Sequence, residues 1–218
     1  DENLLVAAGN FNAADPFNNF VEVYSLKNPK DKPKVIYGFK GEVGDVHFTP
    51  DSKGFFARDN EGHSVRYCDF NTVREVITEK DKIRNIDLSP DGTILAGVTD
   101  AGNQGALYLW NTHSFTTKSV YKNQRAGLYA ISFSPDGLRV VIGDSRGLIK
   151  ILADGTVIRE LPGHESAIQE IKFNHSGKFM ASSSKDKTVR LWNLENLKEQ
   201  PIKLADHPNW VWSIAFSP

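Results

Sequence analysis

The sequence predicts an all-β fold assembled from repeated units of four strands. A short phrase of the type Phe-Ser-Pro-Asp-Gly recurs at intervals of about 40 to 45 residues, a spacing typical of repeats that each form one four-stranded sheet. Apolar residues keep a fixed offset before every copy and alternate with polar ones, as in a strand with one packed face. Four strands joined by short turns leave no room for helices within a repeat.

The recurring phrase is a turn that ends one strand and begins the next. Proline presets φ, aspartate caps the local backbone, and glycine supplies a positive φ where it is present. Each copy therefore marks the same point of a repeat. The copies begin at Phe48, Leu88, Phe133, Phe173 and Phe216.

The other strands of a repeat follow the turn in a constant order. A second strand rich in small residues, such as 93–98, 139–143 or 178–183, suits the crowding between neighbouring sheets. A third strand ends in Leu-Trp-Asn, and a fourth, more polar one follows, as at residues 117–121. The strand that precedes the turn is expected to be the innermost one.

The two ends of the chain share one repeat. Residues 4–9, 20–26 and 34–39 have the pattern of second, third and fourth strands, and residues 210–216 have the pattern of a first strand. The sequence thus predicts about five four-stranded units, four complete and one split between the termini. Either the C-terminal strand closes a five-membered ring, which removes exposed sheet edges, or residues 1–218 are a five-repeat segment of a larger, seven-membered one. An end directly after Phe-Ser-Pro favours the segment.

Residues 161–193 resemble a nearly complete WD40 repeat, the unit of a β-propeller family. They carry Gly-His at 163–164, Ser-Lys-Asp at 184–186 and Leu-Trp-Asn at 191–193, with Asn193 where the family usually has Asp. The resemblance implies a WD40-type β-propeller whose units are blades. It also implies a buried hydrogen-bonded chain in this blade. The expected members of that chain are His164, Ser182, Asp186 and Trp192.

A Ser, a His and an Asp in one repeat also invite a catalytic interpretation, with a nucleophile and its base. We expect a structural network instead, because the family resemblance places these side chains in the interior. A network that is only partly satisfied would cost stability. The prediction is therefore that this set supports the fold and has no catalytic role.

The expected binding surface lies where the innermost strands begin, because in propellers these positions rim one mouth of the central channel. Trp, Tyr and Arg are the residue types enriched in binding hot spots. The alternative is that the tryptophans only pack between blades. A second candidate is the insertion at residues 10–19, since loops on a rigid scaffold often carry recognition. The predicted partner-binding residues are Trp212, Trp210, Tyr129, Arg84 and Arg125.

Composition limits the possible partners. The chain has 26 Lys and Arg against 27 Asp and Glu, a formal net charge of -1, which disfavours nucleic acid and anionic membranes as partners. No apolar stretch approaches the ~18 residues of a membrane span. Cys68 is the single cysteine, so no internal disulfide forms, and a reducing, cytoplasmic location is expected.

The expected function is a non-catalytic scaffold or sensor module that binds a protein or peptide at the propeller rim, without a cofactor or metal. Similarity to bacterial signalling proteins that append a WD40 propeller to other domains adds such domains as expected partners. The alternative is a propeller hydrolase or lactonase with its site at the channel mouth. Against it, the predicted rim offers only Glu42 as an acid, and His63 and Cys68 lack the spacing of a metal site.

Overall fold

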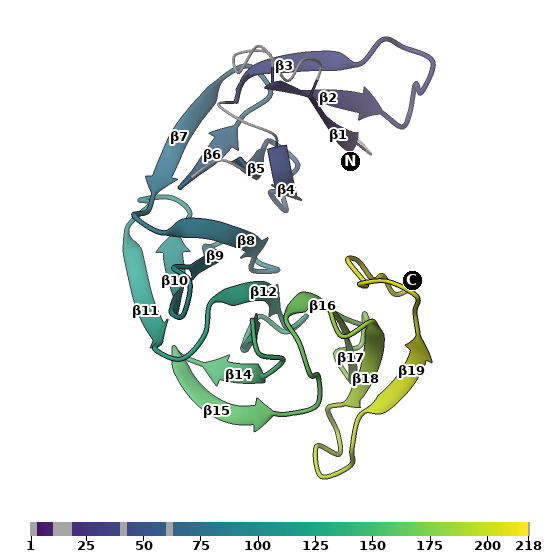
Figure 1. The fold of residues 1–218 in the computed structure, drawn as a ribbon. Coiled ribbons are helices and arrows are strands. Elements are labelled where there is room, and N and C mark those ends of the chain that lie inside the picture. Colours follow the sequence, from purple (N-terminus) through teal and green to yellow (C-terminus); the bar gives the residue numbers. More distant parts are fainter. Residues whose placement is uncertain (1–3, 11–18, 40–42, 60–62, 218) are drawn as a thin grey trace. The chain divides into compact units, whose positions relative to one another are not determined.

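The computed structural model of the chain consists of antiparallel β-sheets (Figure 1). It describes residues 4–10, 19–39, 43–59 and 63–217. The chain folds as two compact units, residues 1–83 and 84–218. The prediction of an all-β fold built from four-stranded repeats is confirmed. Most of the expected binding insertion, residues 11–18, and the rim residue Glu42 lie outside the described residues.

The first unit contains two sheets. The three-stranded sheet is formed by β1 (Leu4–Asn10), β2 (Asn19–Ser25) and β3 (Lys34–Phe39). The four-stranded sheet is formed by β4 (Val43–Phe48), β5 (Phe55–Asp59), β6 (Ser64–Cys68) and β7 (Val73–Thr78). Val21, Ile36, Phe39 and Phe55 belong to one buried apolar cluster that joins the two sheets.

The second unit contains three four-stranded sheets. The first is formed by β8 (Lys82–Leu88), which begins just before the unit boundary, β9 (Ile94–Asp100), β10 (Gly105–Asn111) and β11 (Thr117–Asn123). The second is formed by β12 (Leu128–Phe133), β13 (Val140–Asp144), β14 (Ile149–Ala153) and β15 (Thr156–Leu161). The third is formed by β16 (Ile168–Phe173), β17 (Phe179–Ser184), β18 (Thr188–Asn193) and β19 (Ile202–Asp206).

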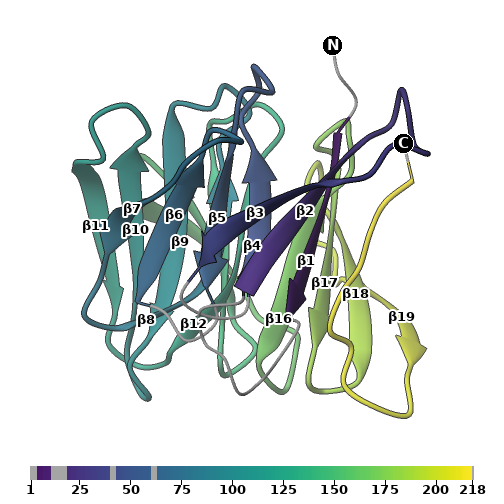
Figure 2. The same ribbon diagram turned by 90° about the horizontal axis from the view of Figure 1, so that it is seen from above.

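The strands of the second unit are arranged from the inside outward in chain order. In Figure 1, β8, β12 and β16 lie on its inner side, and β11, β15 and β19 lie on its outer side. The view turned by 90° shows the strands of this unit lengthwise, so that its loops gather at their two ends (Figure 2). Residues at equivalent strand ends of different sheets are therefore brought to one end of the unit.

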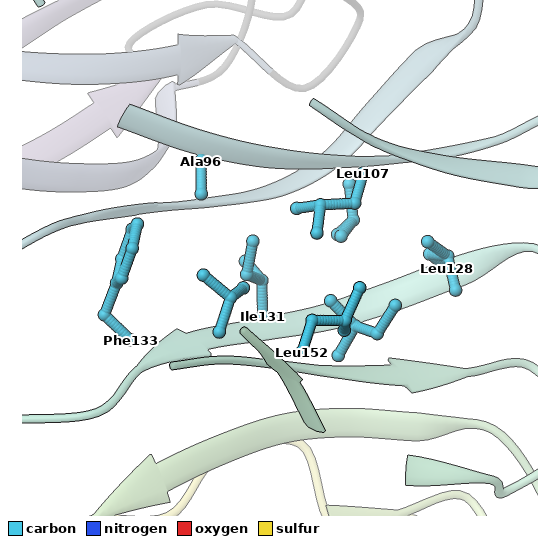
Figure 3. Packing of buried hydrophobic residues seen from close by; sticks show 9 residues of the cluster. Ala96, Leu107, Leu128, Ile131, Phe133 and Leu152 are labelled. Atoms are coloured by element: carbon cyan, nitrogen blue, oxygen red, sulfur yellow. The ribbon is translucent and has the colours of Figure 1, made fainter. Parts of the chain in front are cut away.

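Apolar side chains fill the space between neighbouring sheets of the second unit. Figure 3 shows Leu128, Ile131 and Phe133 of β12 facing Ala96 and Leu107 of the preceding sheet. Leu107 is only 1% exposed. Burial of apolar surface of this kind is the main favourable contribution to folding.

Carboxylates add polar links between consecutive repeats of the second unit. Asp87 on β8 accepts a hydrogen bond of 2.7 Å from the backbone N–H of Phe133 on β12. Glu170 on β16 accepts one of the same length from the backbone N–H of Ile214. Each link joins a side chain of one repeat to the main chain of the next.

The recurring phrase forms the turn that the sequence predicts. Ser89 Oγ donates to Asp91 Oδ1 at 2.6 Å, and the backbone N–H of Thr93 donates to the same oxygen at 3.0 Å. These hydrogen bonds lower the pKa of Asp91, and the bond from Ser89 has the largest effect. Gly92 has φ of +73°, the left-handed conformation that a side chain would strain. The side chain of the aspartate therefore closes the turn.

The prediction of a strand near the C-terminus was wrong. Residues 207–217 belong to no strand, although an innermost strand was expected at 210–216. The backbone N–H of Val211 donates to Ser184 O at 3.2 Å, at the end of β17, and that of Ile214 donates to the Glu170 side chain. Among the described residues, no neighbouring strand pairs with this segment, so it forms no ladder of hydrogen bonds.

Candidate functional site

A buried hydrogen-bonded chain links four side chains around the β16–β19 sheet. Trp192 Nε1–H donates to Ser182 Oγ at 2.9 Å, and Ser182 Oγ lies 2.8 Å from His164 Nε2. His164 Nδ1 lies 2.7 Å from Asp186 Oδ2. Because the Asp186 carboxylate can only accept, Nδ1 carries the hydrogen, and in the neutral ring Nε2 then accepts from Ser182 Oγ, which assigns the Nδ1–H tautomer to His164. The structure thus brings all four residues of the expected network together.

The negative charge of this network is held on Asp186. Burial lowers the pKa of His164, although the neighbouring carboxylate acts to raise it. The pKa of Asp186 is lowered to about 2: burial acts to raise it, but hydrogen bonds from Thr188, the Glu165 backbone and His164 outweigh that effect. The hydroxyl and backbone N–H of Thr188 donate to Asp186 Oδ1 at 2.7 and 2.9 Å. At neutral pH an uncharged imidazole therefore meets an ionised carboxylate.

The network has the connectivity of a catalytic triad but lacks access to a substrate. Ser182 has 0% of its surface exposed, and Trp192 is buried over it. A nucleophilic hydroxyl must reach the atom that it attacks. Ser182 Oγ instead lies between an indole N–H and an imidazole, which supports a structural role for the set.

A second cluster, on the second unit, is partly exposed. The guanidinium of Arg84 lies 4.9 Å from the ring centroid of Tyr129, and the ammonium of Lys185 lies 5.9 Å from the same ring. The Lys185 ammonium also lies 4.4 Å from the Trp210 ring and 5.9 Å from the Trp212 ring. We call this cluster the aromatic–basic surface. Its members are Arg84, Asp100, Tyr129, Lys185, Trp210 and Trp212.

The two tryptophans are the most exposed members of the aromatic–basic surface. Trp210 is 49% exposed and Trp212 is 62% exposed. Their ring centroids are 5.6 Å apart, with an interplanar angle of 65°. Such edge-to-face pairs add to the stability of the arrangement beyond simple burial. About half or more of the surface of each tryptophan is thus available to solvent.

Strand register explains why these residues meet. Arg84 is the third residue of β8, and Tyr129 is the second residue of β12, each one position after a buried residue, Ile83 and Leu128. Lys185 directly follows β17, and its backbone N–H donates to Ala167 O at 2.9 Å, just before β16. The inner strand of one repeat and the end of the second strand of another therefore contribute to the same surface.

Backbone hydrogen bonds fix the segment that carries the tryptophans. Val211 N–H binds Ser184 O, and Ile214 N–H binds the Glu170 carboxylate. Trp210 and Trp212 flank Val211, so their rings come to lie against Lys185. The segment needs no strand partner to hold this position.

A carboxylate that the sequence analysis did not place at the rim neutralises Arg84. Asp100 Oδ2 accepts from Arg84 Nη2 at 2.6 Å and from Nε at 3.1 Å. A side chain at Gly127 would overlap the Asp100 carboxylate, so glycine is needed there. Burial raises the pKa of Tyr129 most, and the negative charge of Asp100 raises it further. Arg84 is thus a positioned, paired cation.

Arg125, the fifth predicted binding residue, does not join the cluster. Its side chain is exposed, and its backbone N–H donates to Asn123 Oδ1 at 3.4 Å. Within the described part of the chain, no contact links it to Arg84, Tyr129 or the tryptophans. The structure therefore brings four of the five predicted binding residues together, through Lys185.

Lys185 and Asp100 are the members that sequence reasoning missed at this surface. They occupy equivalent positions, since each lies two residues beyond the last residue of its second strand that pairs with the third strand, Ser183 in β17 and Val98 in β9. Counting from the strand pattern of each repeat would have found both. The predicted rim used only the innermost strands, which excluded them.

The described residues contain no metal-binding cluster: none of their His, Cys, Asp and Glu side chains form a group of three or more that could hold an ion. Cys68, considered with His63, has 0% exposed surface, and burial raises the pKa of its thiol to about 11. In the portion of the chain that the structure describes, no helix is both long and apolar enough to cross a membrane.

Comparison with known proteins identifies the repeat. Residues 155–193 match the family model for "WD40: WD domain, G-beta repeat". This range includes the complete buried network described above.

Three curated relatives are similar over longer stretches. The human "WD repeat and SOCS box-containing protein 1" is 35% identical over 89 residues, 39% of this chain and 21% of the relative. The "Periodic tryptophan protein 2 homolog" of Schizosaccharomyces pombe is 30% identical over 205 residues, 84% of this chain and 23% of the relative. The "Nuclear distribution protein PAC1" of Coccidioides posadasii is 26% identical over 227 residues, 88% of this chain and 48% of the relative. The chain thus spans less than half the length of each.

Proposed function

The chain belongs to the WD40 repeat family, and from this premise we propose that it is a non-catalytic module that binds a protein or peptide partner on the aromatic–basic surface. WD40 repeat proteins are typically scaffolds for protein interaction. The observation that carries the proposal is the exposure of Trp210 and Trp212 on a segment whose backbone is held in place.

Physical reasons favour this surface over others on the second unit. Binding energy concentrates in a few aromatic and arginine side chains near the centre of an interface. Residues already held in their bound arrangement lose little conformational entropy when a partner docks. Trp212, Tyr129 and Arg84 satisfy both conditions, because cation–π and ion-pair contacts order them before any partner binds.

The proposal extends to the parent protein. We propose that the chain works beside other domains of a larger protein and that its repeats belong to a longer propeller. The greater length of the three relatives supports this. We include a bacterial signalling protein among the proposed parents. The three relatives are eukaryotic and do not support this part of the proposal. The cytoplasm is the proposed location, because a chain with one cysteine needs no oxidising compartment.

A double variant tests the binding surface. In Trp212→Ala/Arg84→Ala, we expect retention of co-purifying polypeptides from a cell extract, quantified by mass spectrometry, to fall at least about tenfold, the effect of losing one hot spot. The matched control is Tyr37→Ala/Arg159→Ala, which removes an exposed aromatic and an arginine from the outer strands β3 and β15. Equal retention by the parent and the Trp212/Arg84 variant would show that the partner binds elsewhere. Stoichiometric metal in the purified chain would instead favour the hydrolase alternative.

A further inference from the structure

Lys185 is a cation for which the described part of the chain provides no anionic partner. Its ammonium faces the Tyr129, Trp210 and Trp212 rings, at 4.4 to 5.9 Å from their centroids. Among the described residues, no carboxylate lies within ion-pair distance of it. The side chain is half-buried, so its charge is partly shielded from water by the rings.

Lys185 differs in this respect from the other cation of the surface. Arg84 is neutralised by two hydrogen bonds to Asp100. The excess positive charge of the aromatic–basic surface therefore comes from Lys185. That charge lies beside Trp212, the more exposed of the two tryptophans.

The chemistry of this arrangement selects one class of partner. A cationic side chain would be repelled by Lys185, which already occupies the faces of the rings. A purely apolar side chain would cover the ammonium without pairing it, which costs free energy. A phosphate dianion usually requires several arginines, whereas Arg84 is paired here and the Asp100 carboxylate would repel a doubly charged group.

We propose that Lys185 is the specificity residue of this surface and pairs with an acidic side chain, Glu or Asp, of the partner peptide. The carboxylate binds the Lys185 ammonium while neighbouring apolar groups of the peptide pack on Trp212. Ion pairs that are partly removed from water are stronger than fully exposed ones. This inference rests on the proposed function, because it assumes that the partner docks on the aromatic–basic surface.

Peptide pools provide the test. The probes are three fluorescein-labelled dodecapeptide pools of identical degenerate composition, each with a fixed central residue: Glu, Gln or Lys. We expect the parent chain to bind the Glu pool about two- to five-fold more strongly than the Gln pool, the range of a partly exposed ion pair. The Lys pool should bind most weakly, and the preference for Glu should shrink as salt rises.

Variants of Lys185 connect this preference to one residue. Lys185→Met keeps an unbranched apolar side chain on the rings and should bind the Glu and Gln pools equally, at the level of the parent with Gln. Lys185→Arg keeps the charge and should keep the preference. Lys198→Met, at an exposed lysine elsewhere in the same repeat, should match the parent.

The outcomes separate this inference from the proposed function. Equal binding of the Glu and Gln pools by the parent, or a Glu preference that survives in Lys185→Met, would overturn the role of Lys185. A parent chain that binds the Lys pool more strongly than the Gln pool would do so too, and would show that the rings bind cations. If Trp212→Ala weakens binding of both the Glu and Gln pools, the surface itself stands. If Trp212→Ala changes neither, the proposed function fails at this surface.

Discussion

Equivalent positions of two repeats carry opposite charges at the aromatic–basic surface. Asp100 in the β8–β11 sheet and Lys185 in the β16–β19 sheet both lie two residues past the part of a second strand that pairs with the third strand. The aspartate pairs with Arg84, whereas the lysine contacts aromatic rings. The identity of a single residue thus determines whether this part of a repeat is locally neutral or positive.

The buried network predicts a pH dependence of stability. The pKa of His164 is lowered in the folded state, mainly by burial, so the unfolded chain binds its proton at a higher pH. Stability is therefore present at pH 7 and falls as pH drops through the ordinary histidine range near ~6.5. The lowered pKa of Asp186, about 2, adds a further loss below its ordinary value of 3.8. We expect the Tm to fall from about pH 7 to about pH 5, measured by circular dichroism.

Replacing the histidine tests the origin of that fall. His164→Asn should be less stable at pH 7 by about 1–3 kcal/mol, because Ser182 and Asp186 lose a buried partner. Its Tm should also change less between about pH 7 and about pH 5. His207→Asn, at an exposed histidine, should keep the full fall. An undiminished fall in His164→Asn would show that another group is responsible.

The role of a residue could be predicted from the sequence where the residue belongs to a local sequence motif. The four network residues follow from one repeat and its resemblance to WD40, and the structure places them within hydrogen-bonding distance. Lys185 was missed because the predicted rim used only the innermost strands, and a position at the end of a second strand does not by itself show which rings the side chain meets. Its role depends on residues 210 and 212, which are brought to it by the backbone bonds of Val211 and Ile214.

At the scale of elements, packing between sheets is the main source of stability. Leu107 on β10 is 1% exposed and belongs to the apolar layer between the β8–β11 and β12–β15 sheets. We expect Leu107→Ala to lower the free energy of unfolding by about 2–5 kcal/mol, through lost burial and a residual cavity. Chemical denaturation provides the measurement.

The matched control for that substitution is another leucine. Leu138, in the turn between β12 and β13, is 73% exposed, so Leu138→Ala should change stability by less than about 0.5 kcal/mol. Similar losses in both variants would mean that the apolar layer contributes little.

Strands were predictable because each repeat has its own turn and alternation. The four complete units have the expected order, with innermost strands from Val43, Lys82, Leu128 and Ile168. The segment 210–216 has the same alternation but forms no strand. A strand requires a partner as well as a pattern, and the pattern alone does not report whether a partner is present.

At the scale of the whole molecule, the proposal that the repeats belong to a longer propeller predicts how the isolated chain behaves in solution. If residues 1–218 belong to a longer propeller, they expose sheet edges and apolar faces that neighbours would cover. We then expect the isolated chain to self-associate or to unfold in more than one step. Sedimentation equilibrium over a dilution series, with calorimetry, measures both. A compact monomer with a single cooperative transition would instead support a closed ring of five.

The carboxylate links between repeats have a consequence for how freely the sequence of a repeat can vary. Asp87 and Glu170 each bind a main-chain N–H of the following repeat. Every residue except proline supplies that group, so the link itself sets no requirement on the receiving side chain, whereas it requires an acceptor at the acidic position. At Phe133 the receiving side chain is constrained by the apolar layer instead. Such one-sided dependence lets adjacent repeats drift apart in composition while their spacing is retained. In this chain the family model matches residues 155–193, whereas four sheets have four antiparallel strands each.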